Sequence, residues 1–283
     1  MIELGRADDR FPPRLRAIFD PPRALYVRGA GELELLGRRA VAVVGARSCS
    51  PYGAQVARMV GRELAAVGLV VVSGLARGVD GEAHRGALDA GGLTVAVLGC
   101  GIDREYPASN AQLSRRIEEK GLVVSEYEPG VGPAPWRFPA RNRIIAGLSE
   151  AVVVVEARER SGALITADFA LEEGREVLAV PGEITSSLSS GTNALLKLGA
   201  APLTATADVL DLLGIDPPAA LDATVSEAAA QVLALVRDSA CGADELTARS
   251  VLDAGALSVA LTELELAGLV AATDGVYRAV TTR

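Results

Sequence analysis

Short apolar runs alternate with helical patterns along most of the chain, and this alternation restricts the fold more than any other feature. The runs are apolar at consecutive positions, which is typical of strands buried on both faces in a parallel sheet covered by helices. The sequence therefore predicts a doubly wound α/β fold. The expected strands are Val41–Val44, Leu69–Ser73, Thr94–Leu98, Leu122–Ser125, Val152–Glu156, Val177–Val180 and one near 202–204; the expected helices are Gly53–Val67, Gly81–Ala90, Ala108–Lys120, Arg141–Leu148, Ile165–Glu173 and Thr192–Leu198.

The segments on either side of this body differ from it. Residues 1–38 contain proline pairs that break any long helix, so an N-terminal adapter is expected before a main domain at 39–213. Residues 214–224 are aperiodic and contain two prolines, which indicates a linker. Residues 225–283 show three short helical patterns and then two strands joined by a turn at Asp274 and Gly275. This order predicts a small winged-helix domain.

The composition indicates an ordinary soluble protein. Hydrophobic residues make up 49% of the 283 residues, and no stretch approaches the ~20 apolar residues of a membrane span. A cytoplasmic location is expected. The net charge of −8 argues against a general nucleic-acid coating protein, which is usually basic. The charge is nevertheless uneven, because residues 137–160 hold five Arg against three Glu.

The sequence offers little for catalysis or for a metal. His84 is the only histidine, and its place four residues after Asp80 on a helix favours a capping or solvated role. Cys49, Cys100 and Cys241 are scattered, lack ligand spacing and are expected to pack as small residues. We therefore expect no catalytic residue, no metal site and no cofactor.

Glycines and polar residues gather where the strands end, which is where open α/β sheets bind ligands. After the first expected strand, the turn that begins at Gly45 lacks the second glycine of the dinucleotide motif G-x-G-x-x-G, and a Walker A loop is absent from the sequence. The turn carries Arg47 instead. Any turn of this kind favours a glycine, but a guanidinium there suits a phosphate group.

The stretch FPARNRIIAGLSEAVVVVEARERSGALIT, residues 138–166, adds more anion-binding groups at the same edge. Arg141 and Arg143 are expected to open a helix, and Ser161 is expected to open the next one. Both helix N-termini and guanidinium groups hold phosphate. The two arginines lie two positions apart and point in different directions, so one is expected to meet an anion while the other pairs with Glu150 or Glu156.

Aromatic side chains flank this stretch. Trp136 and Phe138 could each stack on an unpaired base, although burial against the sheet is the expectation for Trp136. Aromatic residues make up only 4% of the chain, so a broad stacking surface is not expected.

Six blocks in order between about Phe11 and Leu213 carry a family resemblance: VAVVGAR, SGLARGVDGEAHRGAL, VAVLGCGIDREYPASN, FPARNRIIAGLSEAVVVVEA, SGALITADFALEEGREVLAVPG and GTNALLKLGA. Together they resemble the DNA-processing protein A family (DprA, also called Smf). The resemblance implies an extended Rossmann-like fold that binds single-stranded DNA and loads the RecA recombinase onto it. It further implies a non-enzymatic role in natural transformation and recombination, protection of incoming strands, contact with single-strand-binding protein, and a homodimer through the Rossmann domain.

The resemblance also implies which residues contact DNA. Lys197 is the weakest candidate among the residues named next, because its side chain could equally cap the end of its helix. The implied residues are Arg47, Ser48, Gly74, Arg137, Phe138, Arg141, Asn142, Arg143, Ser161, Gly162, Thr166 and Lys197.

Two departures from the family pattern affect these expectations. Many members carry a preceding helical domain of the SAM or helix-hairpin-helix kind, which this sequence lacks. From residue 225 onward there are four Arg against eight acids, and the expected third helix SVALTELELAG holds no Lys or Arg. A DNA-reading helix normally shows some. We therefore expect the winged helix to bind protein, or to pack on its neighbour, instead of gripping DNA.

Three alternatives stay open at this point. A nucleotide-binding or nucleotide-hydrolysing enzyme of the lysine-decarboxylase-like Rossmann group would show a PGGxGTxxE-like loop, whose elements this sequence splits between two segments. A transcription regulator is suggested only by the winged helix. For the dimer, the apolar segment Thr206–Leu213 could be the edge, or it could pack against the last strand.

Overall fold

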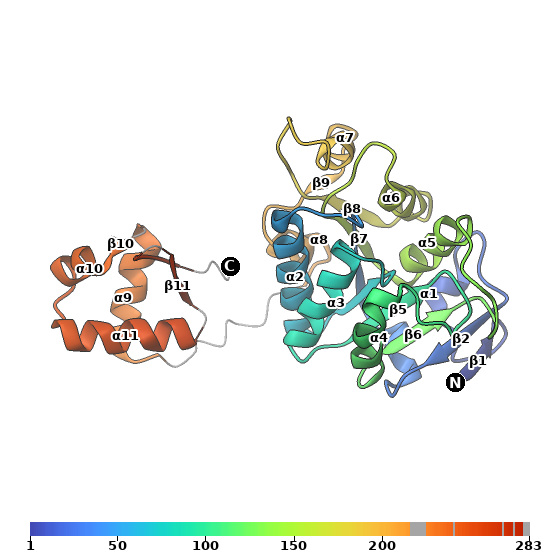
Figure 1. Ribbon diagram of the computed structural model, residues 1–283, viewed down its shortest axis with the longest axis horizontal. Helices are drawn as coiled ribbons and strands as arrows, with labels where there is room; N and C mark the ends of the chain where they lie inside the picture. Colours follow the sequence, from blue (N-terminus) through green and yellow to red (C-terminus); the bar gives the residue numbers. More distant parts are fainter. Residues whose placement is uncertain (216–224, 240, 268, 274, 280–283) are drawn as a thin grey trace. The chain divides into compact units, whose positions relative to one another are not determined.

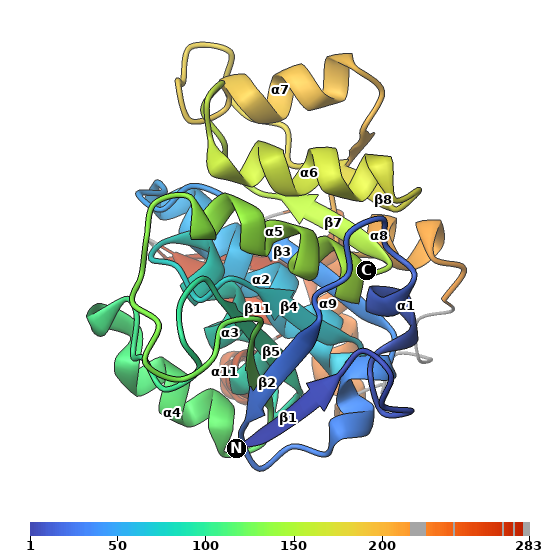
Figure 2. The ribbon, with the colours of Figure 1, turned by 90° about the vertical axis from the view of Figure 1, so that its right-hand side faces the viewer.

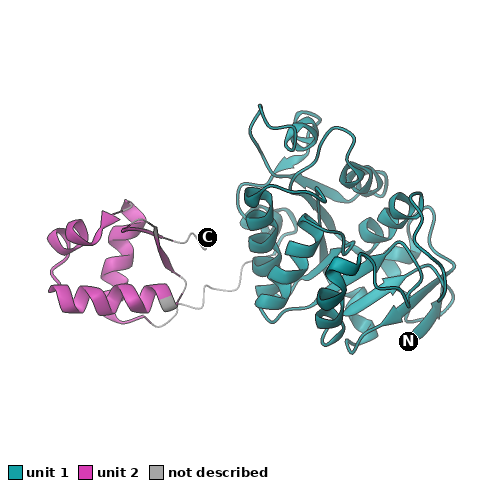
Figure 3. Cartoon of the chain, in the orientation of Figure 1, with its two compact units in different colours: residues 1–216 teal, residues 217–283 magenta. Residues whose placement is uncertain are grey.

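A computed structural model describes residues 1–215, 225–239, 241–267, 269–273 and 275–279. The chain divides into two compact units, Met1–Asp216 and Pro217–Arg283 (Figure 3). Most of the expected linker at 214–224 lies outside the described residues, as does Asp274 of the expected turn. Gly214 still donates a hydrogen bond to the carbonyl of Asp211.

The first unit is built on one sheet of nine strands in the order β1-β2-β6-β5-β4-β3-β7-β8-β9 (Figure 1). The strands from β3 to β9 are parallel, whereas β1 and β2 are antiparallel and extend the sheet beyond β6. The mostly parallel sheet confirms the predicted fold class. The strands are β1 (Ile2–Gly5), β2 (Ala24–Arg28), β3 (Ala40–Val44), β4 (Val70–Ser73), β5 (Thr94–Leu98), β6 (Leu122–Ser125), β7 (Ala151–Val154), β8 (Glu176–Ala179) and β9 (Ala201–Pro202).

Helices cover both faces of this sheet (Figure 2). On β3, Ala42 and Val44 join the core under α1, α5 and α6, while Val41 and Val43 join the core under α2, α3 and α8. Neighbouring positions on one strand are therefore both buried, as the apolar runs predict. The helices are α1 (Pro13–Arg16), α2 (Pro51–Ala66), α3 (Val79–Asp89), α4 (Ala111–Glu118), α5 (Arg137–Leu148), α6 (Gly162–Glu172), α7 (Ser190–Lys197) and α8 (Ala207–Leu212), with 3₁₀ turns at Leu33–Gly37 and Ala108–Asn110.

Residues 1–38 do not form a separate adapter. They supply β1, β2 and α1, and they belong to the same compact unit as the rest of the sheet. Leu4, Phe11 and Leu15 are fully buried in the core beneath α5. The proline pairs do prevent a long helix here, but β1 and β2 pair with each other and with β6, which makes the segment part of the sheet.

The second unit has the predicted winged-helix order. Its elements are α9 (Glu227–Asp238), β10 (Cys241–Gly242), α10 (Ala243–Arg249), α11 (Ala254–Leu266), β11 (Val270–Thr273) and β12 (Val276–Ala279), and its sheet has the order β10-β12-β11. It buries its own core, which includes Val232, Leu246 and Leu264. The third helix, α11, contains no Lys or Arg.

The strand order of the first unit reverses beside β3. The chain builds outward from β3 through β4, β5 and β6, and then returns to place β7, β8 and β9 on the other side. The carboxyl ends of β3 and β7 therefore diverge into a crevice, the usual ligand position in sheets of this type. No helix among the described residues is long and apolar enough to cross a membrane.

Candidate functional site

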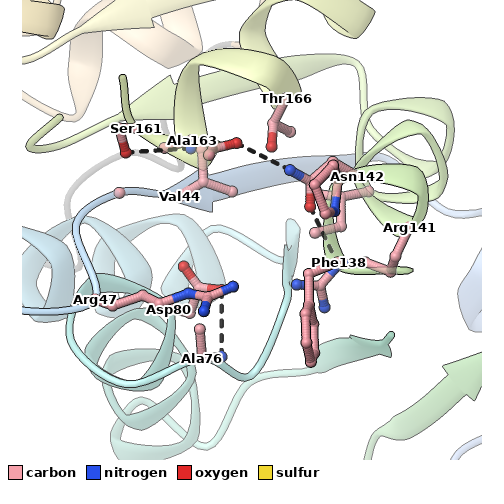
Figure 4. A pocket seen from close by; sticks show the side chains of 14 residues that line it. Val44, Arg47, Ala76, Asp80, Phe138, Arg141, Asn142, Ser161, Ala163 and Thr166 are labelled. Carbon is pink, nitrogen blue, oxygen red and sulfur yellow. Dashed lines mark hydrogen bonds between the residues drawn. The ribbon is translucent and has the colours of Figure 1, made fainter. Parts of the chain in front are cut away.

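A pocket of about 200 Å³ opens at this reversal point (Figure 4). The loops after β3 and β4 form one side of it, and α5 with the start of α6 forms the other. Its lining residues are Val44, Gly45, Arg47, Ala76, Asp80, Phe138, Pro139, Arg141, Asn142, Ile145, Ser161, Gly162, Ala163 and Thr166. Seven of the predicted DNA contacts are thus brought together.

Arg141 is the buried cation of this pocket, with 4% of its surface exposed. Its Nη1 donates to the carbonyl oxygens of Gly74, at 2.8 Å, and Val97, and its Nε donates to Asn142 Oδ1 at 3.2 Å. Burial lowers the pKa of the guanidinium to about 10, so it is still charged at neutral pH. The expectation that Arg141 and Arg143 open a helix was wrong, because α5 begins at Arg137.

The loop after β4 is held against Arg141 by buried polar contacts. The carboxylate of Asp80 accepts hydrogen bonds from the amides of Gly74, at 3.1 Å, and Ala76, at 3.3 Å. Between them Leu75 has a φ of 56°, a left-handed conformation that is unfavourable for any residue other than glycine. Burial raises the pKa of Asp80, while nearby Arg141 opposes the shift. The contacts hold this loop in a strained but defined shape.

Arg47 lies over the ring of Phe138, with its guanidinium carbon 5.2 Å from the ring centroid. The ring of Tyr106 also stacks on Phe138; the two centroids are 5.2 Å apart and the ring planes are inclined by 26°. Gly99 carries no Cβ, and a Cβ there would lie 2.8 Å from the Phe138 ring. We call Arg47, Phe138 and Tyr106 the inner stack; it borders both the main pocket and a smaller one beside Gly74.

The start of α6 completes the pocket. Ser161 caps this helix, as predicted, by accepting a hydrogen bond from the amide of Ala163 at 3.3 Å. Asn142 Nδ2 donates to the carbonyl of Gly162 at 2.9 Å and so ties α5 to α6. Thr166 is buried one turn further on. Nothing lies within 4 Å of the place where a Cβ on Gly162 would be, so a ligand can approach this backbone closely.

Arg143 forms the pairing with an acid that was expected of one of the two arginines, but with different acids. Its guanidinium donates to both carboxylate oxygens of Glu126, at 2.7 and 2.8 Å, and to Asp20 at 3.0 Å. It points away from Arg141, as its spacing predicted, but its partners are neither Glu150 nor Glu156. This side chain therefore neutralises acids beside the pocket.

Four other predicted contacts do not line the main pocket, and one of them, Gly74, lines the smaller pocket. Ser48 is exposed after β3, and Lys197 is exposed at the last residue of α7. Arg137 lies beside the rings of Tyr127 and Trp136, with its guanidinium carbon 5.1 and 4.9 Å from their centroids. The expectation that Trp136 is buried against the sheet was wrong, because 62% of it is exposed.

The N-terminus of the first crossover helix, α2, is already occupied. Glu156 is buried, and its two carboxylate oxygens accept hydrogen bonds from the amide of Ser50 at 2.9 Å and from its hydroxyl at 2.5 Å. In dinucleotide-binding sheets a pyrophosphate sits at this helix terminus. Here the chain supplies its own anion, which argues against a dinucleotide at that position.

His84 is buried, so the expected capping or solvated role was wrong. The hydroxyl of Thr94 donates to the carbonyl of Val71 at 2.6 Å and accepts from His84 Nδ1 at 2.7 Å. Burial lowers the pKa of the imidazole to about 3. The ring is therefore neutral at physiological pH and belongs to the core between α3 and the sheet.

Tyr106 and Asp80 are parts of the site that were not predicted from the sequence. Tyr106 follows β5 in a polar loop, so an aromatic residue at a strand end was a usable signal. Asp80 was visible only as a neighbour of His84 in the sequence, and its contacts with the loop after β4 depend on tertiary structure.

The fold and the pocket define a Rossmann-like α/β protein with a separate winged-helix unit and an arginine- and aromatic-lined site where the strand order reverses. Two family models match the chain: DNA recombination-mediator protein A over residues 4–214, and the DprA winged helix domain over residues 199–275. The chain belongs to the DNA recombination-mediator protein A family.

Two relatives in this family, named DprA and Smf, are similar to most of the chain. DNA processing protein DprA of Streptococcus pneumoniae is 49% identical over 203 residues, which are 72% of this chain and 71% of that protein. Protein Smf of Escherichia coli is 41% identical over 284 residues, covering 96% of this chain and 75% of that protein.

Two solved structures share the fold. DNA processing protein A from S. pneumoniae has a TM-score of 0.71 at 47% identity, with 74% of this chain and 73% of that chain covered. DNA processing protein A from Helicobacter pylori, whose structure concerns its single-stranded DNA binding mode, has a TM-score of 0.66 at 34% identity, with 72% and 92% covered.

Proposed function

We propose that this protein binds single-stranded DNA in the pocket where the strand order reverses. The observation that carries the proposal is the inner stack beside Arg141: an exposed guanidinium over an aromatic ring, backed by a buried guanidinium and an approachable helix start. Arginine forks and helix N-termini hold phosphates without reading sequence. The single-stranded DNA binding mode of the H. pylori relative supports the same ligand.

The rings in this pocket favour an unpaired strand over a duplex. Phe138 and Tyr106 are partly exposed, and they can take up a base only if that base is free of its partner. In a duplex the bases are stacked on each other, and only the backbone would reach Arg47. Single-strand preference is therefore expected to depend on Phe138.

We propose a binding role rather than an enzymatic one. Asp80 is the one carboxylate that lines the main pocket, and it is committed to the amides of Gly74 and Ala76. This leaves it poorly placed as a general base. The nucleotide-hydrolysing alternative would instead predict turnover of nucleotides at this site.

Family membership supports the wider role. We propose that the protein acts in the cytoplasm, protects incoming strands in natural transformation, and loads the RecA recombinase during homologous recombination. Single-strand-binding protein is a further expected partner. The acidic second unit, with no cation on α11, is proposed to contact protein rather than DNA.

We further propose a homodimer through the first unit. The expected edge at 206–213 needs revision, because Val209 and Leu210 on α8 are buried in the core. Of its leucine and valine residues only Leu212 is exposed, at 39%. Substituting Leu210 would therefore test folding, whereas Leu212→Glu tests association. Light scattering after size exclusion should give a smaller mass for Leu212→Glu if this helix forms the edge, and an unchanged dimer would exclude it.

The binding proposal is tested by the affinity of the full chain for labelled oligo-dT. Arg47→Ala should weaken binding and reduce the salt dependence, because each lost phosphate contact lowers the slope of log K against log salt by about 0.7. Arg62→Ala removes an exposed arginine on α2 that does not line the pocket and serves as the matched control. Unchanged affinity for Arg47→Ala, together with nucleotide turnover by the wild type, would overturn the proposal.

A further inference from the structure

A second aromatic and cationic cluster lies outside the pocket. Its members are Tyr127, Arg137 and Trp136, which we call the outer stack. The guanidinium of Arg137 has both rings within 5.1 Å of its carbon, and the two rings meet edge to face with centroids 6.4 Å apart. Trp136 is 62% exposed, which is unusual for the only tryptophan of a chain poor in aromatic residues.

The outer stack continues the line of the pocket along the edge of the sheet. Phe138 of the inner stack lies against Gly99, the residue after β5, whereas Tyr127 follows β6. These strands are neighbours, and their last paired residues are Leu98 and Ser125. The two stacks therefore sit at the carboxyl ends of adjacent strands and are joined through residues 136–138.

The backbone beneath the outer stack is fixed. The amide of Ile102 donates to the carbonyl of Tyr127 at 3.3 Å, and the amide of Gly101 donates to the carbonyl of Val131 at 2.7 Å. Arg137 Nη1 donates to the carbonyl of Gly132 in the same loop. A flat surface that is held in advance loses little conformational entropy when a ligand stacks on it.

The charge beside the outer stack is mixed, because Glu128, directly after Tyr127, is exposed. Glu126 precedes Tyr127, but both of its oxygens are bound by Arg143, so this acid is neutralised. Arg137 then supplies a positive charge beside both rings. A planar base can stack on the exposed indole while the adjoining phosphate meets the guanidinium.

We propose that the outer stack holds a second nucleobase of the same DNA strand, with Trp136 as its stacking surface. This inference rests on the proposed function of the pocket and extends the DNA path from β3 to β6. Unpaired DNA would place one base at the inner stack, at the end of β5, and another at the outer stack, at the end of β6. The arrangement reads no base sequence, because every base offers a stacking face.

The single tryptophan gives this proposal a direct readout. Titration of the full chain with oligo-dT should quench the fluorescence of Trp136, and an abasic strand of equal length should quench it much less. Trp136→Ala should weaken oligo-dT binding by roughly fivefold or more, and Trp136→Phe should restore most of it. Phe138→Ala should still show quenching once enough DNA is added to saturate it.

The outcomes separate the two proposals. Binding of labelled oligo-dT without quenching, and with full affinity in Trp136→Ala, would overturn the outer stack and leave the pocket proposal intact. Absence of DNA binding by the wild type would overturn both. Quenching that is equally strong with the abasic strand would show that the indole senses a phosphate or a conformational change, and would also contradict base stacking.

Discussion

Arg47 and Phe138 come from opposite sides of the pocket, yet the guanidinium of one lies 5.2 Å from the ring centroid of the other (Figure 4). Arg47 follows β3, and Phe138 lies in the first turn of α5, 91 positions later in the chain. Under the proposed function, their contact joins the group that binds phosphate to the surface on which a base stacks. It also gives the pocket an exposed cation in addition to the buried Arg141.

The two arginines should differ when each is replaced. Arg141→Ala removes a buried donor to the carbonyls of Gly74 and Val97 and the cation that most lowers the pKa of Asp80. We therefore expect a loss of about 3–5 kcal/mol in the free energy of unfolding. Arg47 is exposed, so Arg47→Ala should change the free energy of unfolding by about 0.5 kcal/mol or less. Urea unfolding measures both. Equal stability of the two variants would contradict a structural role for Arg141.

Gly74 should not tolerate a methyl group. A Cβ there would lie 2.4 Å from Nη2 of Arg141, whose side chain is held by buried hydrogen bonds and cannot simply move aside. Gly74→Ala should cost about 1–3 kcal/mol of stability and weaken oligo-dT binding. Gly37→Ala, where nothing lies within 4 Å of the added atom, is the matched control. A fully stable Gly74→Ala protein would mean that the loop adjusts freely.

His84 should remain neutral in the folded protein well below pH 6.5. Its pKa is lowered from 6.5 to about 3 by burial, so the unfolded chain binds one more proton between these values. Its contribution to stability is complete above pH 6.5 and is lost as the pH falls toward 3. From pH 7 to pH 5 this amounts to about 2 kcal/mol.

The single histidine makes that prediction direct to measure. The imidazole NMR signals should not titrate between pH 8 and pH 5 in the folded protein, and His84→Gln should flatten the pH dependence of unfolding in this range. A titration midpoint near 6.5 would show that the ring is solvated after all.

The sequence was sufficient for the parallel strands of the sheet, because they are buried on both faces and their turns are rich in glycine. Thr94–Leu98 and Leu122–Ser125 were predicted with the observed bounds. It failed for residues 1–38, where the strands pair antiparallel at an edge and no local pattern reveals their partner. The start of α5 was also placed too late, because Pro139 resembles a break before a helix but is tolerated here in the first turn.

For the site, the sequence identified residue types but not their partners. Arg141 and Arg143 were correctly expected to diverge, yet Arg143 pairs with Glu126 and Asp20, which lie 17 and 123 positions away. Pairings over such separations depend on the topology of the sheet. The exposure of Trp136 was missed for the same reason, because its surroundings are set by the loop after β6.

Affinity for two strands of equal length tests the central claim most directly: labelled oligo-dT, and an abasic strand that has the phosphates without the bases. Arg47→Ala should weaken binding of both strands, because it removes a phosphate contact. Phe138→Ala should weaken oligo-dT by roughly five- to tenfold and the abasic strand much less, because it removes a stacking surface. Arg47→Ala protein that binds both strands as tightly as the wild type, or Phe138→Ala protein that loses affinity for both equally, would contradict the account.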